Sequence, residues 1–166
     1  MNRTTVLAPV ALMTLLLAGG SALASSGPSP SDVATSAAKH EVFCGLGEPI
    51  CRGTKRADAI QGTAGQDDIV GRTGDDLILD DPVTSAGARN DNDTVLGGGG
   101  NDVIDAQEGT VPDTDTIFAG KGNDIVFVQE NDGTFDSVDC GPGTDTVFAD
   151  DNDLLTNCER INPPKI

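Results

Sequence analysis

Ten aspartates in this chain share a local pattern that could bind a hard cation. Each is followed two residues later by an aliphatic residue, and nine of those ten residues are β-branched. The aspartates are Asp58, Asp67, Asp76, Asp93, Asp102, Asp115, Asp124, Asp136, Asp145 and Asp153. Carboxylates and backbone carbonyls are the oxygen ligands that Ca²⁺ takes in proteins. The pattern therefore indicates a series of calcium ligands.

Glycine-rich segments of nine residues contain five of these aspartates. The clearest reads GGGGNDVID from Gly97, and related segments begin at Gly62, Gly71, Ala119 and Cys140. In each copy glycine stands fourth, aspartate sixth and an aliphatic residue eighth. Glycine permits the positive φ and close backbone approach that a tight turn needs. The repeat therefore predicts a six-residue turn and a three-residue strand whose middle side chain points inward.

The nonapeptide resembles the repeats-in-toxin (RTX) family, whose motif is G-G-x-G-x-D-x-U-x. The resemblance covers roughly residues 53–157, and PICRGTKRADAIQGTAGQDDIVG looks like the start of small secreted bacterial calcium-binding proteins of this type. It implies an all-β fold, a parallel β-roll or β-helix solenoid of about five 18-residue coils. Ca²⁺ would bind between stacked coils, and the aliphatic residues would fill one narrow core.

The spacing of the aspartates separates them into two edges of such a roll. Successive spacings are 9, 9, 17, 9, 13, 9, 12, 9 and 8 residues, and every insertion falls on the same alternate set. The edge without insertions, the regular edge, carries Asp76, Asp102, Asp124 and Asp145. The inserted-loop edge carries Asp67, Asp93, Asp115, Asp136 and Asp153. Both sets are predicted metal ligands, and the regular edge should be the main calcium ladder; the inserted loops could add or abolish sites.

Glycines of the turns complete the predicted metal sites. They are Gly74, Gly98, Gly100, Gly120, Gly122 and Gly143. An EF-hand is excluded, because NDNDTV, DTDTIF and DDNDLL place an aliphatic residue or threonine where the third ligand should stand. Aspartates that only end turns would need no metal. Stacked carboxylates about 5 Å apart would, however, repel by about 3 kcal/mol at an effective dielectric of 20.

The N-terminus has the pattern of an export signal. Arg3 precedes the apolar run VLAPVALMTLLLAG, and ALA at residues 22–24 is a small-residue cleavage site. We predict a signal peptide at 1–24, a flexible Ser/Pro/Ala-rich linker at 25–43, the roll at 44–161 and a short tail at 162–166. A retained anchor is the alternative. The protein is therefore expected to be secreted.

The cysteines fit an oxidising compartment. Of the three possible pairings, sequence proximity favours Cys44–Cys51 and Cys140–Cys158, and the second pair is one 18-residue coil apart. A zinc site is not favoured, because the chain has no C-x-x-C and its only histidine is His40. With 27 acidic and 10 basic residues, the chain would be repelled by nucleic acid.

Binding is a more consistent expectation than catalysis. His40 lies in the predicted linker, and the basic residues do not gather beside an acid, which argues against a catalytic triad or a polysaccharide lyase. The leading prediction is a secreted calcium-binding protein. The alternative is an extracellular structural or adhesive scaffold in which calcium is only a folding cofactor.

Two further expectations concern partners and folding. An outward apolar stripe is predicted as a face for a protein partner or self-association, unless an inserted loop or the N-terminal segment covers it. The stripe comprises Leu77, Leu79, Val103, Ile125, Phe127 and Phe148. Each repeat should bury one aliphatic side chain, worth about 1.5–3 kcal/mol, against roughly 1–2 kcal/mol of backbone entropy for every ordered residue. Folding should therefore require calcium and follow export.

Overall fold

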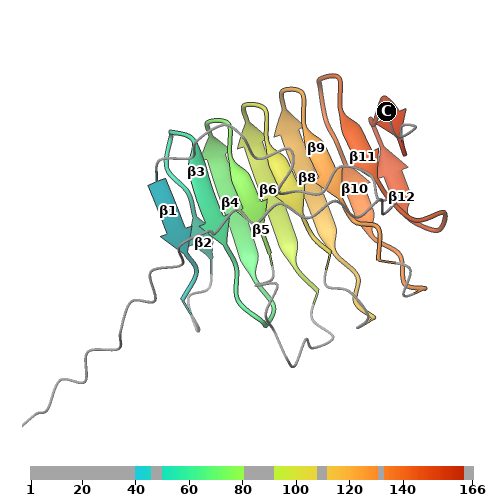
Figure 1. Cartoon of the computed structure of the whole chain (residues 1–166), viewed down its shortest axis with the longest axis horizontal. Helices are drawn as coiled ribbons and strands as arrows, with labels where there is room; N and C mark the ends of the chain where they lie inside the picture. The colour runs from blue at the N-terminus through green and yellow to red at the C-terminus, as the bar shows by residue number, and fades with distance from the viewer. Residues whose placement is uncertain (1–39, 46–49, 81–91, 108–111, 131–132, 163–166) are drawn as a thin grey trace, which may run out of the picture.

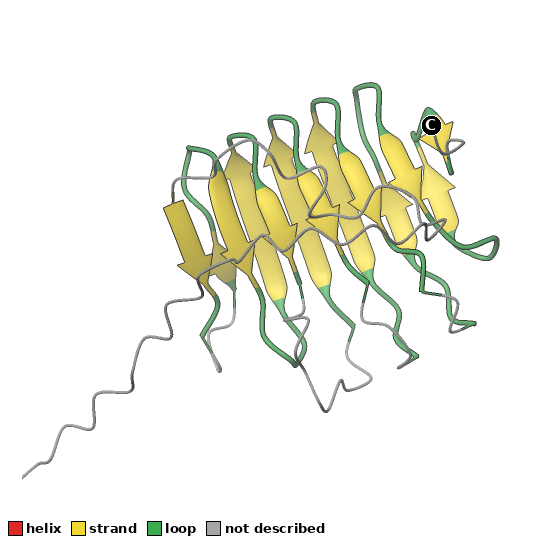
Figure 2. Ribbon diagram, in the orientation of Figure 1, coloured by secondary structure: helices red, strands yellow, loops and turns green. Residues whose placement is uncertain are grey.

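The computed structural model describes residues 40–45, 50–80, 92–107, 112–130 and 133–162. Those residues form a parallel β-solenoid of two facing sheets (Figure 1) and contain no helix (Figure 2). Within this part of the chain no helical segment could therefore span a membrane. The all-β parallel roll predicted from the sequence is confirmed.

Strands alternate between the two sheets along the chain, and every pair of neighbours within a sheet is parallel. The odd sheet contains β1 His40–Phe43, β3 Asp58–Gln61, β5 Leu77–Leu79, β7 Val103–Asp105, β9 Ile125–Phe127, β11 Thr146–Phe148 and β13 Arg160–Ile161. The even sheet contains β2 Cys51–Arg52, β4 Asp68–Thr73, β6 Thr94–Gly99, β8 Thr116–Lys121, β10 Ser137–Asp139 and β12 Leu154–Thr156.

The coils are longer than 18 residues wherever a loop is inserted. Equivalent aspartates on the regular edge are separated by 18, 26, 22 and 21 residues. The repeat itself is preserved, because the extra residues fall between an odd strand and the next even strand. Residues 81–91, which belong to the first insertion, lie outside the described residues.

Three of the even strands are longer than the predicted three residues. β4, β6 and β8 each span six residues, whereas β5, β7 and β9 span three. The even strands continue pairing into the regular turn, as Arg72 pairs with Gly98 and Gly98 with Gly120. The regular edge is therefore held by sheet hydrogen bonds on its even-sheet side.

Two columns of aliphatic residues, one from each sheet, fill the core. They are Ile60, Ile69, Ile78, Val95, Ile104, Ile117, Val126, Val138 and Val147, each 0–1% exposed. Several residues that stand two positions after a core aliphatic residue are also buried beside these columns, namely Ala106, Ala119, Val128, Cys140 and Ala149. Some repeats thus bury two side chains, so the expectation of one per repeat is too low.

The roll begins four residues earlier than predicted. β1 spans His40–Phe43, which falls inside the predicted 25–43 linker, and it pairs with β3. Its first residue, His40, approaches Asp58 with 2.9 Å between Nδ1 and Oδ1. The linker was predicted from the Ser/Ala/Pro-rich composition of the residues before His40, and that composition does not indicate the short strand. The predicted signal peptide and most of the linker lie outside the described residues.

One disulfide lies near each end of the roll. Cys44 pairs with Cys51 and Cys140 with Cys158, with Cα–Cα distances of 5.3 and 5.2 Å. The second bridge joins neighbouring coils, as the coil-length spacing predicts. Both expected pairings are confirmed.

The predicted apolar stripe lies in register on the outer face of the odd sheet. Leu77, Val103 and Ile125 pair along one row. In the next row Phe127 stacks on Phe148, with ring centroids 4.9 Å apart. None of the stripe residues is among the most exposed apolar side chains, and Phe127 is buried. Exposed apolar residues occur elsewhere, including Leu96 and Phe118 on the even sheet.

Candidate metal centre

A ladder of carboxylates runs along the regular edge. In each step, the backbone N–H of one aspartate donates to Oδ1 of the aspartate one coil further on, at 2.8 Å. The successive members are Asp58, Asp76, Asp102, Asp124 and Asp145. All five residues are 0–2% exposed. Backbone stacking therefore fixes one oxygen of each carboxylate from Asp76 onwards and leaves the second oxygen to find its own partner.

The second oxygen is open in four consecutive turns. Oδ2 of Asp76, Asp102, Asp124 and Asp145 is buried and accepts no hydrogen bond from the described residues. Burying a charged oxygen without a partner is costly. The pKa of Asp102 is accordingly raised to about 7, first by burial and then by the charges of Asp124 and its other acidic neighbours. Burial likewise raises the pKa of Asp76 and Asp124 to about 6 each. These turns require a proton or a cation.

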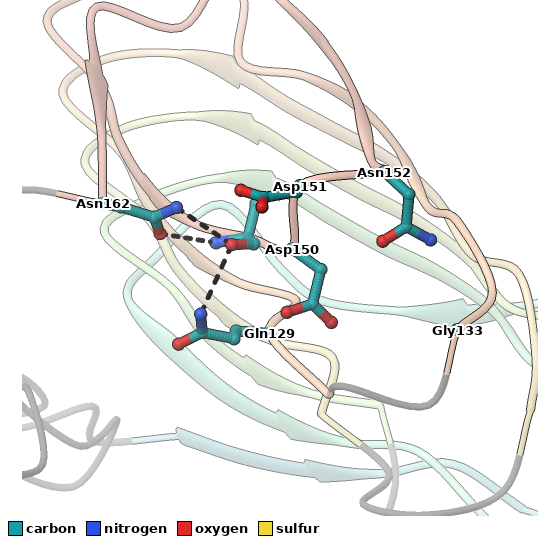
Figure 3. A pocket seen from close by; sticks show the side chains of 7 residues that line it. Gln129, Gly133, Asp150, Asp151, Asn152 and Asn162 are labelled. Carbon is teal, nitrogen blue, oxygen red and sulfur yellow. Dashed lines mark hydrogen bonds between the residues drawn. The ribbon is translucent and has the colours of Figure 1, made fainter.

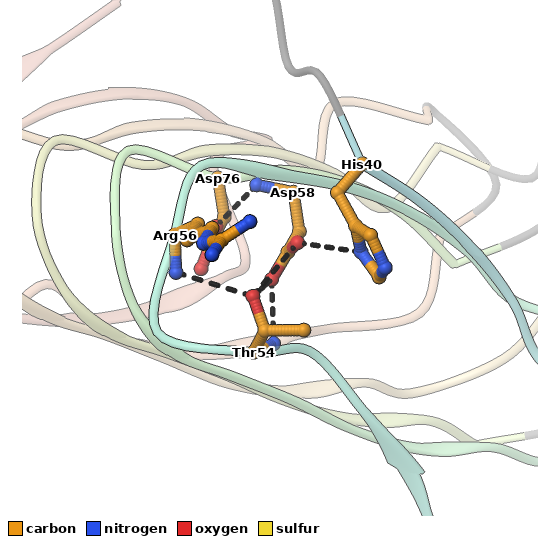
Figure 4. A network of polar contacts seen from close by, with 5 residues as sticks. All are labelled: His40, Thr54, Arg56, Asp58 and Asp76. Carbon is orange, nitrogen blue, oxygen red and sulfur yellow. Dashed lines mark hydrogen bonds and ion pairs between the residues drawn. The ribbon is translucent and has the colours of Figure 1, made fainter.

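In the two most N-terminal turns, a threonine instead donates hydrogen bonds to the second oxygen of the aspartate. The Thr54 N–H donates to Asp58 Oδ2 at 2.5 Å, and its hydroxyl contacts the same oxygen at 2.9 Å (Figure 4). The Thr63 N–H and hydroxyl bind Asp67 Oδ2 at 2.6 and 3.0 Å. The oxygen that is open in the glycine turns is therefore taken here. Asp67, a predicted metal ligand, does not share the open arrangement, and the sequence signal is threonine four residues before aspartate.

The inserted-loop edge carries a second ladder with the same backbone bonds. It comprises Asp67, Asp93, Asp115, Asp136 and Asp153, with N–H to Oδ1 distances of 2.8–3.0 Å. Of these, Asp115 has a buried Oδ2 without a hydrogen bond from the described residues. Burial, followed by the nearby charge of Asp113, raises the pKa of Asp115 to about 8. Asp153 Oδ2 instead accepts the Asp150 N–H at 2.6 Å. Among the described members of the two aspartate ladders, four of the five open oxygens thus lie on the regular edge.

Glycines of the regular turns allow the backbones of adjacent coils to approach closely. Gly98 and Gly120 have φ values of 111° and 114°, and a Cβ on Gly120 would overlap the Gly98 carbonyl. Gly100 and Gly122 stack in the same way two residues later, with φ values of 138° and 141°. The remaining predicted glycines, Gly74 and Gly143, stack in the same fourth-position column as Gly100 and Gly122. The predicted glycines and the four predicted aspartates of the regular edge therefore lie in the same stacked turns, whereas the other five predicted aspartates lie on the inserted-loop edge.

A third ladder, which the sequence analysis missed, lies directly before the aspartates. Asn101 donates its backbone N–H to Asp75 Oδ1, Asn123 to Asn101 Oδ1 and Thr144 to Asn123 Oδ1, at 2.8–2.9 Å. These bonds point toward the N-terminus, opposite to those of the aspartate ladder. The recurring Asp, Asn, Asn and Thr at the fifth position was the available signal. Together the two ladders fix the register of neighbouring turns.

The second residue of the nonapeptide is glycine in most of the stacked turns of the regular edge, and Arg72 is an exception. Its φ is 86°, whereas the equivalent positions hold Gly98, Gly120 and Gly141, also with positive φ.

A left-handed conformation such as that of Arg72 costs a non-glycine residue roughly 1–2 kcal/mol, partly offset by the greater chain entropy of glycine. Arg72→Gly should therefore raise the free energy of unfolding by about 1 kcal/mol in saturating calcium, measured by urea denaturation. Thr73→Gly is the matched control and should lower it; a loss of stability in Arg72→Gly would contradict the strain.

Residues of the last coil close the ladders at the C-terminal end. Glu159 Oε2 accepts the Asp145 N–H at 2.9 Å, in the place of a further aspartate. Asn162 bonds both backbone groups of Ala149 at 3.0 Å, beside a polar cavity of about 330 Å³ that Asp151 also lines (Figure 3). Glu159 lies only 14 residues after Asp145. It therefore breaks the spacing on which the sequence analysis relied.

The ligand set fits calcium. Within the described part of the chain, no three His, Cys, Asp or Glu side chains gather into a metal cluster. A cation on the regular edge would have to combine one or two carboxylates with backbone carbonyls from the stacked turns. Ca²⁺ accepts six to eight such oxygens in flexible geometry, whereas zinc sites use cysteine and histidine. The open Oδ2 atoms provide the charge that this chemistry needs.

Comparison with known protein families agrees with this geometry. The family model described as RTX calcium-binding nonapeptide repeat (4 copies) matches residues 52–79, 88–110 and 112–134. No curated protein and no solved structure matched the chain. The matched segments contain Asp76, Asp102 and Asp124 of the regular ladder, and repeats of this kind are typical of secreted bacterial proteins. The chain therefore carries RTX calcium-binding nonapeptide repeats, folded as a parallel β-roll.

Proposed function

We propose that this protein is a secreted calcium-binding module whose regular edge holds the ions. The observation that carries the proposal is the run of four open oxygens, from Asp76 to Asp145, in successive coils. A bound Ca²⁺ would neutralise these carboxylates and join adjacent turns. Asp102 and Asp124, in the middle of the run, would each face an ion on both sides. Asp115, a member of the inserted-loop ladder, has the same kind of buried, open oxygen.

Calcium binding and roll formation are proposed to be a single event. The buried aspartates lie one coil apart, and residues 25–166 carry 27 acids and 9 bases, a net charge of −18. Bringing these charges together without a counter-ion opposes folding. An ion that binds only the stacked turns stabilises the folded chain by linkage.

Folding is proposed to follow export. The predicted signal at 1–24 and the two disulfides both suit an oxidising, extracellular compartment. In a cytosol kept low in calcium, the open carboxylates would keep the chain from rolling up. We propose binding rather than catalysis, because the repeated acidic residues are engaged in ladders and His40 contacts Asp58.

Calorimetric titration of the oxidised protein with Ca²⁺ tests the assignment. The four open carboxylates lie in four successive turns, which leaves three gaps between them. We therefore expect about three ions on the regular edge. Asp67→Asn should leave the binding heat and stoichiometry unchanged, because Thr63 already holds its second oxygen. Absence of calcium binding, or a loss of ions in Asp67→Asn equal to that in Asp102→Asn, would contradict the proposed sites.

A further inference from the structure

Among the described residues, several core side chains at the two ends of the roll are less buried than those in its middle. Ile161 pairs with Val147 and continues the inward column of the odd sheet, yet it is 52% exposed while Val147 is 0% exposed. At the opposite end Val42 pairs with Ile60 and is only partly buried. Leu155 ends the even-sheet column in the same partly buried state. Each end therefore presents an apolar cross-section of the core.

Within the described part of the chain, each terminal strand pairs with another strand on one edge only. β1 and β2 are the first strands of the odd and even sheets, and β13 and β12 are the last (Figure 1). Because all strands are parallel, a second roll placed end on would continue both sheets with the same pairing. β13 would meet β1 of the next copy, and β12 would meet β2. Unpaired strand edges readily accept such addition.

The two ends carry opposite charge. The described residues of the N-terminal end, 40–45 and 50–58, contain Arg52, Lys55 and Arg56 against Glu41 and Asp58, a net charge of +1 with His40 neutral. Residues 150–162 contain four acids, Asp150, Asp151, Asp153 and Glu159, against Arg160, a net charge of −3. The regular ladder is already closed by Thr54 at one end and Glu159 at the other.

We propose that folded rolls associate head to tail, with the C-terminal end of one copy against the N-terminal end of the next. The contact is heterologous, since different surfaces meet, and a translation along the roll does not close on itself. The product is an open linear chain of copies rather than a dimer. This association goes beyond calcium binding and gives the protein an extracellular structural role.

Variants of the two ends test the proposal in saturating calcium. Sedimentation velocity of the oxidised protein should show a series of species that lengthens with concentration. Val42→Lys blocks the N-terminal end and Ile161→Lys the C-terminal end, and each should weaken association by at least about tenfold, because a lysine would be desolvated against an apolar surface. Phe118→Lys is the control, since Phe118 is 45% exposed on the outer face of the even sheet; it should associate as the unaltered protein does.

Mixing the two end variants distinguishes head-to-tail stacking from other contacts. Each variant keeps one intact end, so an equimolar mixture should form dimers and nothing longer. Circular dichroism in calcium confirms that each variant is folded, which separates this test from that of calcium binding. A folded, calcium-loaded protein that stays monomeric at all concentrations would overturn the proposal. So would a mixture without dimers, or association lost in Phe118→Lys alone.

Discussion

Replacing Asp102 and Asp124 together by alanine should raise the calcium concentration at which half of the chain is folded by at least about tenfold. Each substitution removes a carboxylate whose Oδ2 is open, and a loss of about 1.4 kcal/mol of binding free energy already corresponds to tenfold. Because the two residues occupy neighbouring turns, every gap between open carboxylates loses at least one. A calcium titration followed by far-UV circular dichroism measures the midpoint.

The matched control is the double replacement of Asp93 and Asp136 by alanine. These residues accept the same backbone N–H bonds, at 2.8–2.9 Å, on the inserted-loop edge. The control therefore removes the same ladder bonds without touching the regular edge. It should raise the calcium concentration at half folding less than the double replacement of Asp102 and Asp124 does. Equal shifts in the two double variants would show that the regular edge has no special role in calcium binding.

Acid should replace calcium as the stabiliser of the roll. In the calcium-free folded state, burial raises the pKa of Asp76 and Asp124 to about 6 and that of Asp102 to about 7, from an ordinary value of 3.8. The folded chain then holds protons that the unfolded chain has released, so protons favour folding. This contribution is complete below about pH 4 and is lost as the pH rises through 6 and 7. At about 1.4 kcal/mol per pKa unit, the summed effect is several kcal/mol.

Calcium-free protein should therefore be unfolded at about pH 8 and gain β structure as the pH falls toward about 5. Far-UV circular dichroism in calcium-free buffer measures the transition, and the calcium needed for folding should fall over the same range. The Asp102→Asn variant is the control, because its neutral amide no longer titrates and its pH dependence should be weaker. A calcium-free chain that lost structure on acidification would contradict the buried-carboxylate argument.

The sequence predicted the overall architecture because it depends on periodicity. The Asp-x-aliphatic spacing assigned the nine aspartates from Asp67 onwards to the correct edge, and Asp76 does stack on Asp102 across a 26-residue separation. The coil-length separation of Cys140 and Cys158 likewise predicted their bridge. Insertions did not disturb either prediction, because they lengthen a loop without changing the register of the strands.

Features that do not repeat were missed. β1 is a single strand without a glycine turn before it, and Glu159 takes an aspartate's place at an irregular spacing. Thr54 and Thr63 alter which carboxylates are open through local hydrogen bonds, which the Asp pattern alone does not reveal. The burial of Phe127 depends on tertiary packing. Its outward position in the strand had predicted exposure.

Far-UV circular dichroism of the oxidised protein at about pH 7.5, first in chelator and then with calcium added, tests the central claim most directly. We expect a largely disordered spectrum in chelator and a cooperative gain of β structure on calcium addition. The open, buried oxygens of Asp76, Asp102, Asp124 and Asp145 make the calcium-free roll unfavourable at this pH, where most of these carboxyls would be ionised. A full β spectrum in chelator, unchanged by calcium, would contradict the account.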